Sequence, residues 1–197
     1  MISAIILAAG ESKRMGQPKM LLPWGETTVL GKVISVIRSA GVDDIVTVTG
    51  GFREQVEAIA RQHHSRIIFN VEFANNEMLN SIQCGLRSLK AEAEATLICL
   101  GDQPQVQEGS VRGVCEAFKR SRSSLVVPSH HMRRGHPWLA ARPLWEEILK
   151  MKPPQSPRDV LNAHAKEIEY VQVDTPTILE DLDTPEDYFK FKPQRSG

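Results

Sequence analysis

Residues 5–22 read Ile-Ile-Leu-Ala-Ala-Gly-Glu-Ser-Lys-Arg-Met-Gly-Gln-Pro-Lys-Met-Leu-Leu. A short apolar strand runs here into a loop that carries two glycines, three cations and a proline, and the next helix can be capped near Thr27. Connections between a strand and a helix usually take about 2–6 residues, and much longer ones usually serve a function. Small residues let backbone N–H groups approach an anion, and the cations neutralise its charge. The stretch therefore predicts a site for a polyphosphate.

The composition limits the kinds of protein that this chain can be. Its 197 residues favour one domain, which we place at residues 1–191, followed by a flexible tail at residues 192–197. The 24 basic and 24 acidic residues cancel, which argues against a nucleic-acid partner because such surfaces carry excess positive charge. Apolar runs stay well below the about 20 residues of a membrane span. The cysteines are far apart in sequence and fit buried thiols of a cytoplasmic protein: Cys84, Cys99 and Cys115.

Apolar strands alternate with amphipathic helices along the chain. The strands up to residue 128 are nearly continuous apolar runs, which are typical of a parallel sheet covered by helices on both faces. The expected strands are residues 2–8, 44–49, 66–69, 95–100, 124–128, 135–140 and 167–173, and the expected helices lie at residues 29–40, 56–60, 82–89, 111–118, 143–149 and 157–163. We therefore predict an α/β fold, a three-layer α/β/α sandwich with a mostly parallel, Rossmann-like sheet and a small antiparallel excursion after residue 128.

The loop after the first strand matches neither of the common phosphate-binding motifs. It lacks the Gly-Lys-Ser/Thr of a P-loop and the Gly-x-Gly-x-x-Gly of a dinucleotide site. Gly10 can adopt a conformation closed to other residues, Arg14 can fork onto two phosphate oxygens, and Lys19 can act as a point charge. The alternative is a solvated basic loop. We favour a solvated side chain for Lys13, and we favour phosphate binding for Arg14 and Lys19.

A second polar segment, Gly101-Asp102-Gln103-Pro104, follows a buried strand. Asp102 can be a turn residue or a helix cap, or it can be a hard oxygen ligand for Mg²⁺ beside a triphosphate. Ligands of such sheets bind beyond the carboxyl ends of the strands, which gathers this turn, the loop from Ala8 and the loop after Phe69. That position favours the metal-binding interpretation.

A third polar segment spans residues 179–188 and reads Leu-Glu-Asp-Leu-Asp-Thr-Pro-Glu-Asp-Tyr. Thr184 and Pro185 are typical of the start of a helix, and the acids after them suit its positive end. Asp183 stands immediately before that cap and is not explained by helix initiation. These residues alone leave the role of Asp183 open.

These motifs resemble those of the nucleotidyltransferases that activate molybdenum cofactor and, more broadly, of NTP:sugar-phosphate transferases. The run Leu7-Ala8-Ala9-Gly10, followed by Pro18-Lys19-Met20-Leu21-Leu22-Pro23-Trp24-Gly25, is most similar to the molybdenum cofactor cytidylyltransferases. The guanylyltransferase relatives usually carry glycine at the position of Ala9. The resemblance covers residues 2–189 and implies the fold of the nucleotide-diphospho-sugar transferases, with CTP favoured over GTP.

The resemblance also implies roles for individual residues. The segment at residues 179–188 is similar to one whose aspartate before Thr-Pro binds metal in the family. Asp102 and Asp183 would therefore bind the metal, with Asp181 a weaker candidate, and Arg14 and Lys19 would act with Asp102 in catalysis. Ser81 and Gly85 align with a segment that contacts base and ribose in the family, although Glu77, Leu79 and Asn80 depart from its pattern. The residues implied to bind the nucleotide are Leu7, Ala8, Ala9, Gly10, Arg14, Lys19, Ser81, Gly85 and Asp102.

Residues 130–137 read His-His-Met-Arg-Arg-Gly-His-Pro and form the densest polar cluster in the chain. The histidines have no spacing of a known zinc site, whereas the segment resembles the acceptor side of the family. Arg134 and His136 are therefore expected to contact an anionic acceptor. Arg158 belongs to a second segment that resembles one near the acceptor pocket, and the start of a helix would explain it almost as well.

The resemblance implies an enzyme that transfers CMP from CTP to the terminal phosphate of a molybdopterin-type cofactor and releases pyrophosphate, with Mg²⁺ as its cofactor. A molybdoenzyme or its chaperone is a protein partner to consider, and neither nucleic acid nor a membrane is expected. Two alternatives stay open. One is a transferase that acts on another small phosphate or uses GTP, and the other is a non-catalytic module that carries the cofactor and need not keep both carboxylates.

Overall fold

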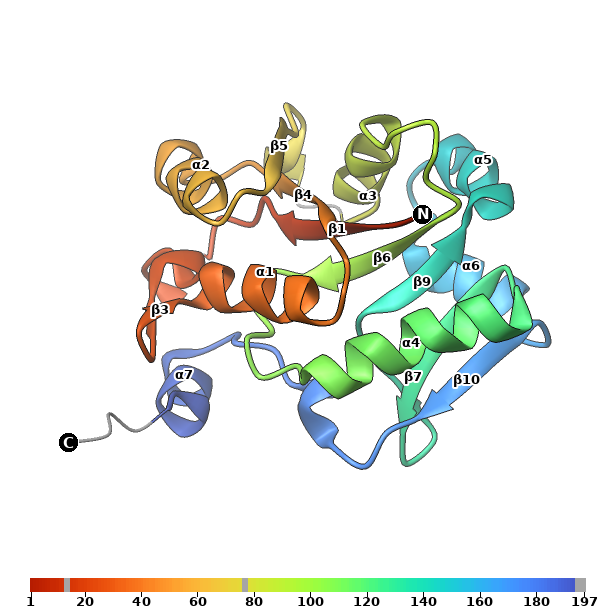
Figure 1. Ribbon diagram of the computed structural model, residues 1–197. Coiled ribbons are helices and arrows are strands. Elements are labelled where there is room, and N and C mark those ends of the chain that lie inside the picture. Colours follow the sequence, from red (N-terminus) through yellow and green to blue (C-terminus); the bar gives the residue numbers. More distant parts are fainter. Residues whose placement is uncertain (13–14, 76–77, 194–197) are drawn as a thin grey trace.

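The computed structural model describes residues 1–12, 15–75 and 78–193 of the chain, in which strands and helices alternate (Figure 1). The strands are β1 (Ile2–Ala8), β2 (Pro23–Trp24), β3 (Thr27–Thr28), β4 (Asp44–Thr49), β5 (Arg66–Phe69), β6 (Ala95–Leu100), β7 (Leu125–His130), β8 (Arg133–Arg134), β9 (Trp138–Ala141) and β10 (Ile168–Gln172). The α-helices are α1 (Val29–Ser39), α2 (Arg53–Gln62), α3 (Met78–Arg87), α4 (Glu108–Ser121), α5 (Arg142–Lys150), α6 (Pro157–Ala163) and α7 (Pro185–Phe191). Short 3-10 helices are η2 (Lys19–Leu21), η3 (Phe73–Asn75) and η4 (Pro176–Leu179).

The principal sheet has eight strands in the order β10-β7-β9-β6-β1-β4-β5, with β8 paired to β7. Strand β1 pairs in parallel with β4 and β6, and the β4–β5 and β10–β7 pairs are also parallel. Strand β9 runs antiparallel between β6 and β7. The sheet therefore confirms the predicted mostly parallel topology with an antiparallel excursion after residue 128.

One strand and one loop differ from what the sequence predicted. The strand expected at residues 135–140 begins only at Trp138, because Pro137 has no N–H to offer to a neighbouring strand, and β8 forms ahead of it. The long loop expected between the first strand and the first helix contains η2 and a hairpin of β2 with β3. Gly25, at a φ of 61°, makes the tight turn of that hairpin.

The side chains of β1 alternate between two hydrophobic cores. Ala4, Ile6 and Ala8 pack on one face with residues of α1, α2 and α4, whereas Ile5 packs on the other with residues of α3, α5 and α6. Figure 1 shows α1 and α4 lying along the same face of the sheet. The fold is thus the predicted three-layer sandwich. In the described part of the chain, every helix falls short of the length and apolarity needed to cross a bilayer.

A third, smaller core joins the two ends of the chain. It contains apolar side chains from the connection after β1, from the first turn of α1 and from the segment around α7: Met15, Leu22, Trp24, Val29, Leu182 and Tyr188. The hydroxyl of Tyr188 donates to the carbonyl oxygen of Pro23 at 2.7 Å, and its ring lies 6.3 Å from that of Trp24. This core holds residues 182–188 against the loop that follows β1.

The amino ends of β1, β4 and β5 hold a buried ion-pair network around Asp44. Arg66 donates to both carboxylate oxygens of Asp44 at 3.0 and 3.1 Å, and the Ser3 hydroxyl donates at 2.7 Å. The Asp44 side chain is 4% exposed. Burial by itself would raise the pKa of Asp44, but the hydrogen bonds from Arg66 and Ser3 outweigh it and hold the pKa below its usual value. This network at the amino ends of β1, β4 and β5 contributes to stability.

We predict that Asp44→Ala lowers the free energy of unfolding by about 3 kcal/mol at pH 7, because it leaves Arg66 without its buried partner. Urea denaturation measures the change. The matched control is Asp43→Ala, whose side chain is 92% exposed and 4.0 Å from Arg38, and which should change stability by less than about 0.5 kcal/mol. Because the pKa of Asp44 is lowered, the difference from the wild type should shrink as the pH falls below 3.8. Equal stabilities of the two variants at pH 7 would contradict the prediction.

Candidate active site

The carboxyl ends of β1 and β6 lie side by side, in register at Leu7 and Leu100. The N–H of Gly101 donates to the carbonyl oxygen of Leu7 at 3.0 Å, so the two turns leave the sheet together. A side chain at position 101 could not be accommodated, since its Cβ would lie 2.9 Å from that carbonyl oxygen. A cavity of about 340 Å³ opens beyond these turns, lined by Leu7, Ala9, Gly10, Lys19, Met20, Phe73, Met78, Ser81, Leu100, Asp102, Asp181 and Asp183.

The charged centre of this cavity is the ammonium of Lys19, which lies between two carboxylates. Its Nζ donates to Oδ2 of Asp102 and, at 3.4 Å, to Oδ1 of Asp183. The three side chains are 13%, 15% and 35% exposed, respectively. Residues separated by 83 and 164 positions in the chain thus share one half-closed site.

Backbone contacts explain how the second carboxylate reaches this site. Leu182 is fully buried in the third core, and its N–H donates to the carbonyl oxygen of Asp102 at 3.2 Å. The next turn begins α7 with a capping box in which Thr184 and Asp187 bond reciprocally. Asp183 lies between these two fixed points, and its side chain therefore faces the turn that carries Asp102. On the other side, the N–H of Lys19 donates to the Ser12 hydroxyl at 3.1 Å.

A third carboxylate, Asp181, lines the same cavity. Burial, together with the negative charges of Asp102 and Asp183, raises the pKa of Asp181 to about 6. Gln103 opposes this shift, because its Nε2 donates to Oδ1 of Asp181 at 2.6 Å. The sequence motif pointed to Asp102 but gave Gln103 no role, and its position directly after that aspartate was the only signal.

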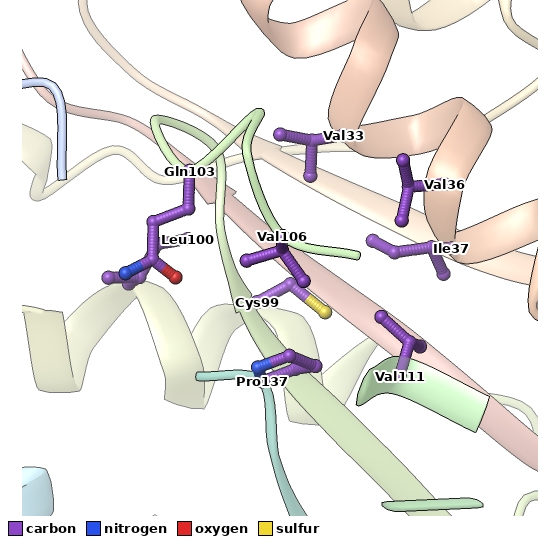
Figure 2. Close-up of a pocket in the computed structure, with 9 residues that line it drawn as sticks. All are labelled: Val33, Val36, Ile37, Cys99, Leu100, Gln103, Val106, Val111 and Pro137. Carbon is purple, nitrogen blue, oxygen red and sulfur yellow. The ribbon is translucent and has the colours of Figure 1, made fainter. Parts of the chain in front are cut away.

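The other side of Gln103 borders a small apolar cavity of about 20 Å³ beneath α1 and α4. Figure 2 shows the Gln103 amide directed away from the side chains of Val33, Val36 and Ile37. Within the described residues, the buried Oε1 of Gln103 has no hydrogen-bond partner. A space of this size and polarity holds at most about one water molecule, so it is no second ligand site.

The structure distributes the expected nucleotide-binding residues unevenly. Leu7, Ala9, Gly10 and Ser81 line the cavity, and the Ser81 hydroxyl accepts a hydrogen bond from Asn70 at 3.1 Å. Gly10 does so without the left-handed backbone that was expected. A Cβ at position 10 would meet no protein atom within 4 Å, so its absence leaves room for a ligand.

Two expected residues lie elsewhere, and one falls outside the described residues. Ala8 is buried in the core beneath the cavity. Gly85 packs α3 onto β1, since a Cβ there would lie 2.6 Å from Ile5, and it is a packing residue for that reason. A glycine in a helix looks the same in sequence whether it faces a ligand or a strand. Arg14 is outside the described part of the chain.

The donors in the cavity suit Mg²⁺ only in combination with a phosphate. Oxygens of Asp102 and Asp183 that contact one ammonium are also close enough to share one cation. The described residues contain no group of three or more His, Cys, Asp or Glu side chains arranged to hold a metal ion by themselves. Mg²⁺ is commonly held by one or two carboxylates that are completed by substrate phosphates and water. The carboxylate pair fits that pattern.

A second cavity of about 1050 Å³ adjoins the first, and Met78 lines both. All three expected acceptor residues line it: Arg134, His136 and Arg158. The described residues around it include three arginines and no aspartate or glutamate. Arg134 donates to neutral oxygens, those of Tyr170 at 2.9 Å and Asn162 at 3.0 Å, which leave its positive charge uncompensated.

A family model described as a MobA-like NTP transferase domain matches residues 4–168. The chain belongs to the MobA-like NTP transferase family. It is 28% identical over 195 residues to the molybdenum cofactor cytidylyltransferase of Escherichia coli (strain K12), covering 97% of this chain and 95% of that protein. It is 29% identical over 143 residues to nicotine blue oxidoreductase of Paenarthrobacter nicotinovorans, covering 69% of each.

Solved structures agree with the family. The crystal structure of Rv0371c from Mycobacterium tuberculosis H37Rv superimposes with a TM-score of 0.83 at 28% identity and covers 96% of both chains. The same mycobacterial protein in complex with manganese superimposes with a TM-score of 0.76 at 26% identity and covers 97% of both. This chain is thus a MobA-like nucleotidyltransferase, and its fold is that of the nucleotide-diphospho-sugar transferases.

In this MobA-like transferase, His136 differs from the arginines around it. Burial lowers the pKa of His136 to about 4. The imidazole is therefore neutral near pH 7, and it can offer an N–H donor but no positive charge to a ligand. Its backbone N–H donates to the carbonyl oxygen of Ile178 at 2.9 Å, which fixes its place in the wall of the second cavity.

We predict that His136 makes the fold sensitive to acid. The pKa of His136 is about 4 in the folded state and 6.5 in the unfolded state. Between these two pH values the unfolded chain binds a proton at His136 and the folded chain does not. Stability should fall as the pH drops from 6.5 towards 4, and His136→Gln should remove this component. Urea midpoints at pH 7 and pH 4.5 measure it. The control is His131→Gln, an exposed neighbour, which should keep the wild-type slope. A slope unchanged by His136→Gln would reject this account.

Proposed function

We propose that this nucleotidyltransferase is a molybdenum cofactor cytidylyltransferase, which transfers CMP from CTP to the terminal phosphate of molybdopterin and releases pyrophosphate. The observation that carries the proposal is the shared contact of Lys19 with Asp102 and Asp183 inside a cavity at the carboxyl ends of β1 and β6. Ligands of parallel α/β sheets bind at such an edge. The E. coli relative, aligned over nearly the whole of both chains, supports the choice of reaction.

Backbone N–H groups and a cation at the cavity support the binding of a triphosphate. The backbone at Ala9 and Gly10 borders it without bulky side chains, so N–H groups can approach phosphate oxygens. Lys19 offers a positive charge to the phosphates, and Arg14 remains a proposed second cation. Transfer of a nucleotidyl group requires the acceptor phosphate to attack the α-phosphorus in line. This chemistry depends on positioning and charge neutralisation, and a protein nucleophile is not required.

Mg²⁺ is the proposed cofactor. Asp102 and Asp183 would hold it, and it would supply charge neutralisation for the triphosphate when bound. The manganese complex of the mycobacterial relative supports a divalent cation in this family without deciding between metals.

The second cavity suits the acceptor. Its three arginines can bind an anionic molecule, and the exposed ring of Tyr170 supplies aromatic surface for a flat ring system. Arg134 and Arg158 would contact anionic groups there, while neutral His136 would donate a hydrogen bond. Because Met78 lines both cavities, an acceptor in the second one can extend a phosphate into the first. The proposed location of the reaction is the cytoplasm, in keeping with three cysteines that form no disulfide.

The substrate assignment is tested by measuring pyrophosphate release by the purified protein. Each of CTP, GTP, UTP and ATP is combined first with molybdopterin and then with a panel of sugar 1-phosphates, with Mg²⁺ present. We expect release with CTP and molybdopterin. Ala9 supports CTP, because the guanylyltransferase relatives usually carry glycine there. Release with sugar phosphates alone, or with GTP in preference to CTP, would reject the assignment.

We predict that Lys19→Ala and Asp102→Asn each lower kcat for this transfer by at least about 10²-fold, since each removes a charge beside the triphosphate. Steady-state pyrophosphate release measures the loss, and thermal unfolding shows whether the variants stay folded. Asp43→Asn, an exposed carboxylate at the other end of the sheet, is the matched control and should keep wild-type kcat. Near-normal kcat in either site variant would remove that residue from the mechanism.

A further inference from the structure

The Lys19 ammonium lies where a cation shared by Asp102 and Asp183 would be held. We propose that Lys19 is the counter-ion of this carboxylate pair in the nucleotide-free protein, and that it must leave the pair before a divalent cation can bind there. The triphosphate of the incoming nucleotide provides the other anionic partner for the lysine. This inference rests on the proposed function, because it takes the nucleotide and the metal to meet at this cavity.

The first step of the argument is the electrostatics of the site. Asp102 is 15% exposed and Asp183 is 35% exposed, and Asp181 adds a third carboxylate to the same cavity. Like charges at this separation disfavour each other strongly unless a cation lies between them. Among the described residues, Lys19 is the cation that contacts two of the three.

The second step is that the lysine and a divalent cation compete. Both would be held by the carboxylates of Asp102 and Asp183, which Lys19 already contacts. A metal that arrives alone must displace the ammonium of a side chain that is 13% exposed, and that ammonium has no triphosphate to move to. The lysine therefore weakens metal binding to the nucleotide-free protein.

The third step is that the lysine can move while its backbone stays in place. Its N–H is tied to the Ser12 hydroxyl at 3.1 Å, but the ammonium is carried on a flexible stem of four carbons. A triphosphate that borders Gly10 adds negative charge on the far side of the ammonium and adds oxygen ligands for a metal. Nucleotide and metal then assist each other, and such coupling is reciprocal by thermodynamic necessity.

The alternative is that Lys19 is a structural ion pair of the folded protein. The two views predict different effects of removing its charge. A structural lysine, when neutralised, would weaken metal binding and nucleotide binding together. A counter-ion, when neutralised, would weaken nucleotide binding and strengthen metal binding.

The test measures both affinities separately. Mn²⁺ binding to the full chain is followed without nucleotide by the electron paramagnetic resonance signal of free Mn²⁺, and CTP binding is followed in EDTA by equilibrium dialysis. Lys19→Met and Lys19→Gln should bind Mn²⁺ at least about tenfold more tightly than the wild type, because a competing unit charge is gone. The same two variants should bind metal-free CTP at least about tenfold more weakly.

Three further variants serve as controls. Lys19→Arg keeps the charge and should leave Mn²⁺ binding as weak as in the wild type. Lys90→Met removes a lysine whose Nζ lies 3.3 Å from Asp44 at the other end of the sheet, and it should change neither affinity. Adding Asp102→Asn to Lys19→Met should abolish the gain in Mn²⁺ affinity.

The proposal is overturned if the neutral variants bind Mn²⁺ no more tightly than the wild type, or if they bind CTP equally well in EDTA. A neutral variant that unfolds by itself and stays unfolded when Mn²⁺ is added overturns it as well. Failure of the proposed function looks different. The wild type would then release no pyrophosphate from CTP and molybdopterin, whereas intact release with unchanged Mn²⁺ affinities rejects the exchange of cations alone.

Discussion

The ammonium of Lys19, held between the carboxylates of Asp102 and Asp183, is the contact on which the arrangement of the site depends. Three segments that are distant in the chain meet at this point, and each brings one charge. Acidic side chains can be placed this close in a half-closed cavity because a cation lies between them. The same requirement underlies our proposal that a metal and a triphosphate take the place of the lysine contacts.

The third core is what makes this meeting possible. The sheet by itself brings together the turns after β1 and β6, because these strands are parallel neighbours. Asp183 comes from a segment outside the sheet, and it is positioned by buried Leu182 and by the contact of Tyr188 with Pro23. The packing of α7 against the loop after β1 therefore completes the site (Figure 1).

The charged side chains at the two ends of the parallel strands differ in their surroundings. At the amino ends, Asp44 is fully satisfied by Arg66, Ser3 and Lys90, and this network contributes to stability. At the carboxyl ends, charges are left available to ligands: Arg134 is held by neutral oxygens, and Asp181 is kept at a raised pKa by burial and by the neighbouring carboxylates. The described residues that line the second cavity include no acid, whereas three aspartates line the first. Met78 lines both cavities, which favours ligands that meet at that boundary.

The sequence alone determined the layer architecture and the principal charged residues. Nearly continuous apolar strands between amphipathic helices require a sheet covered on both faces, and helix signals such as Ser156-Pro157 place α6 at its observed bounds. Asp102 followed from the break of a buried strand, whereas the role of Asp183 was implied by the resemblance of its segment to the family. The tertiary structure decided the rest, because burial and distance depend on segments far apart in the chain. It placed Gly85 against Ile5 instead of in the cavity, joined Gln103 to Asp181, and brought Lys19 between the two aspartates, none of which a local pattern of residues can encode.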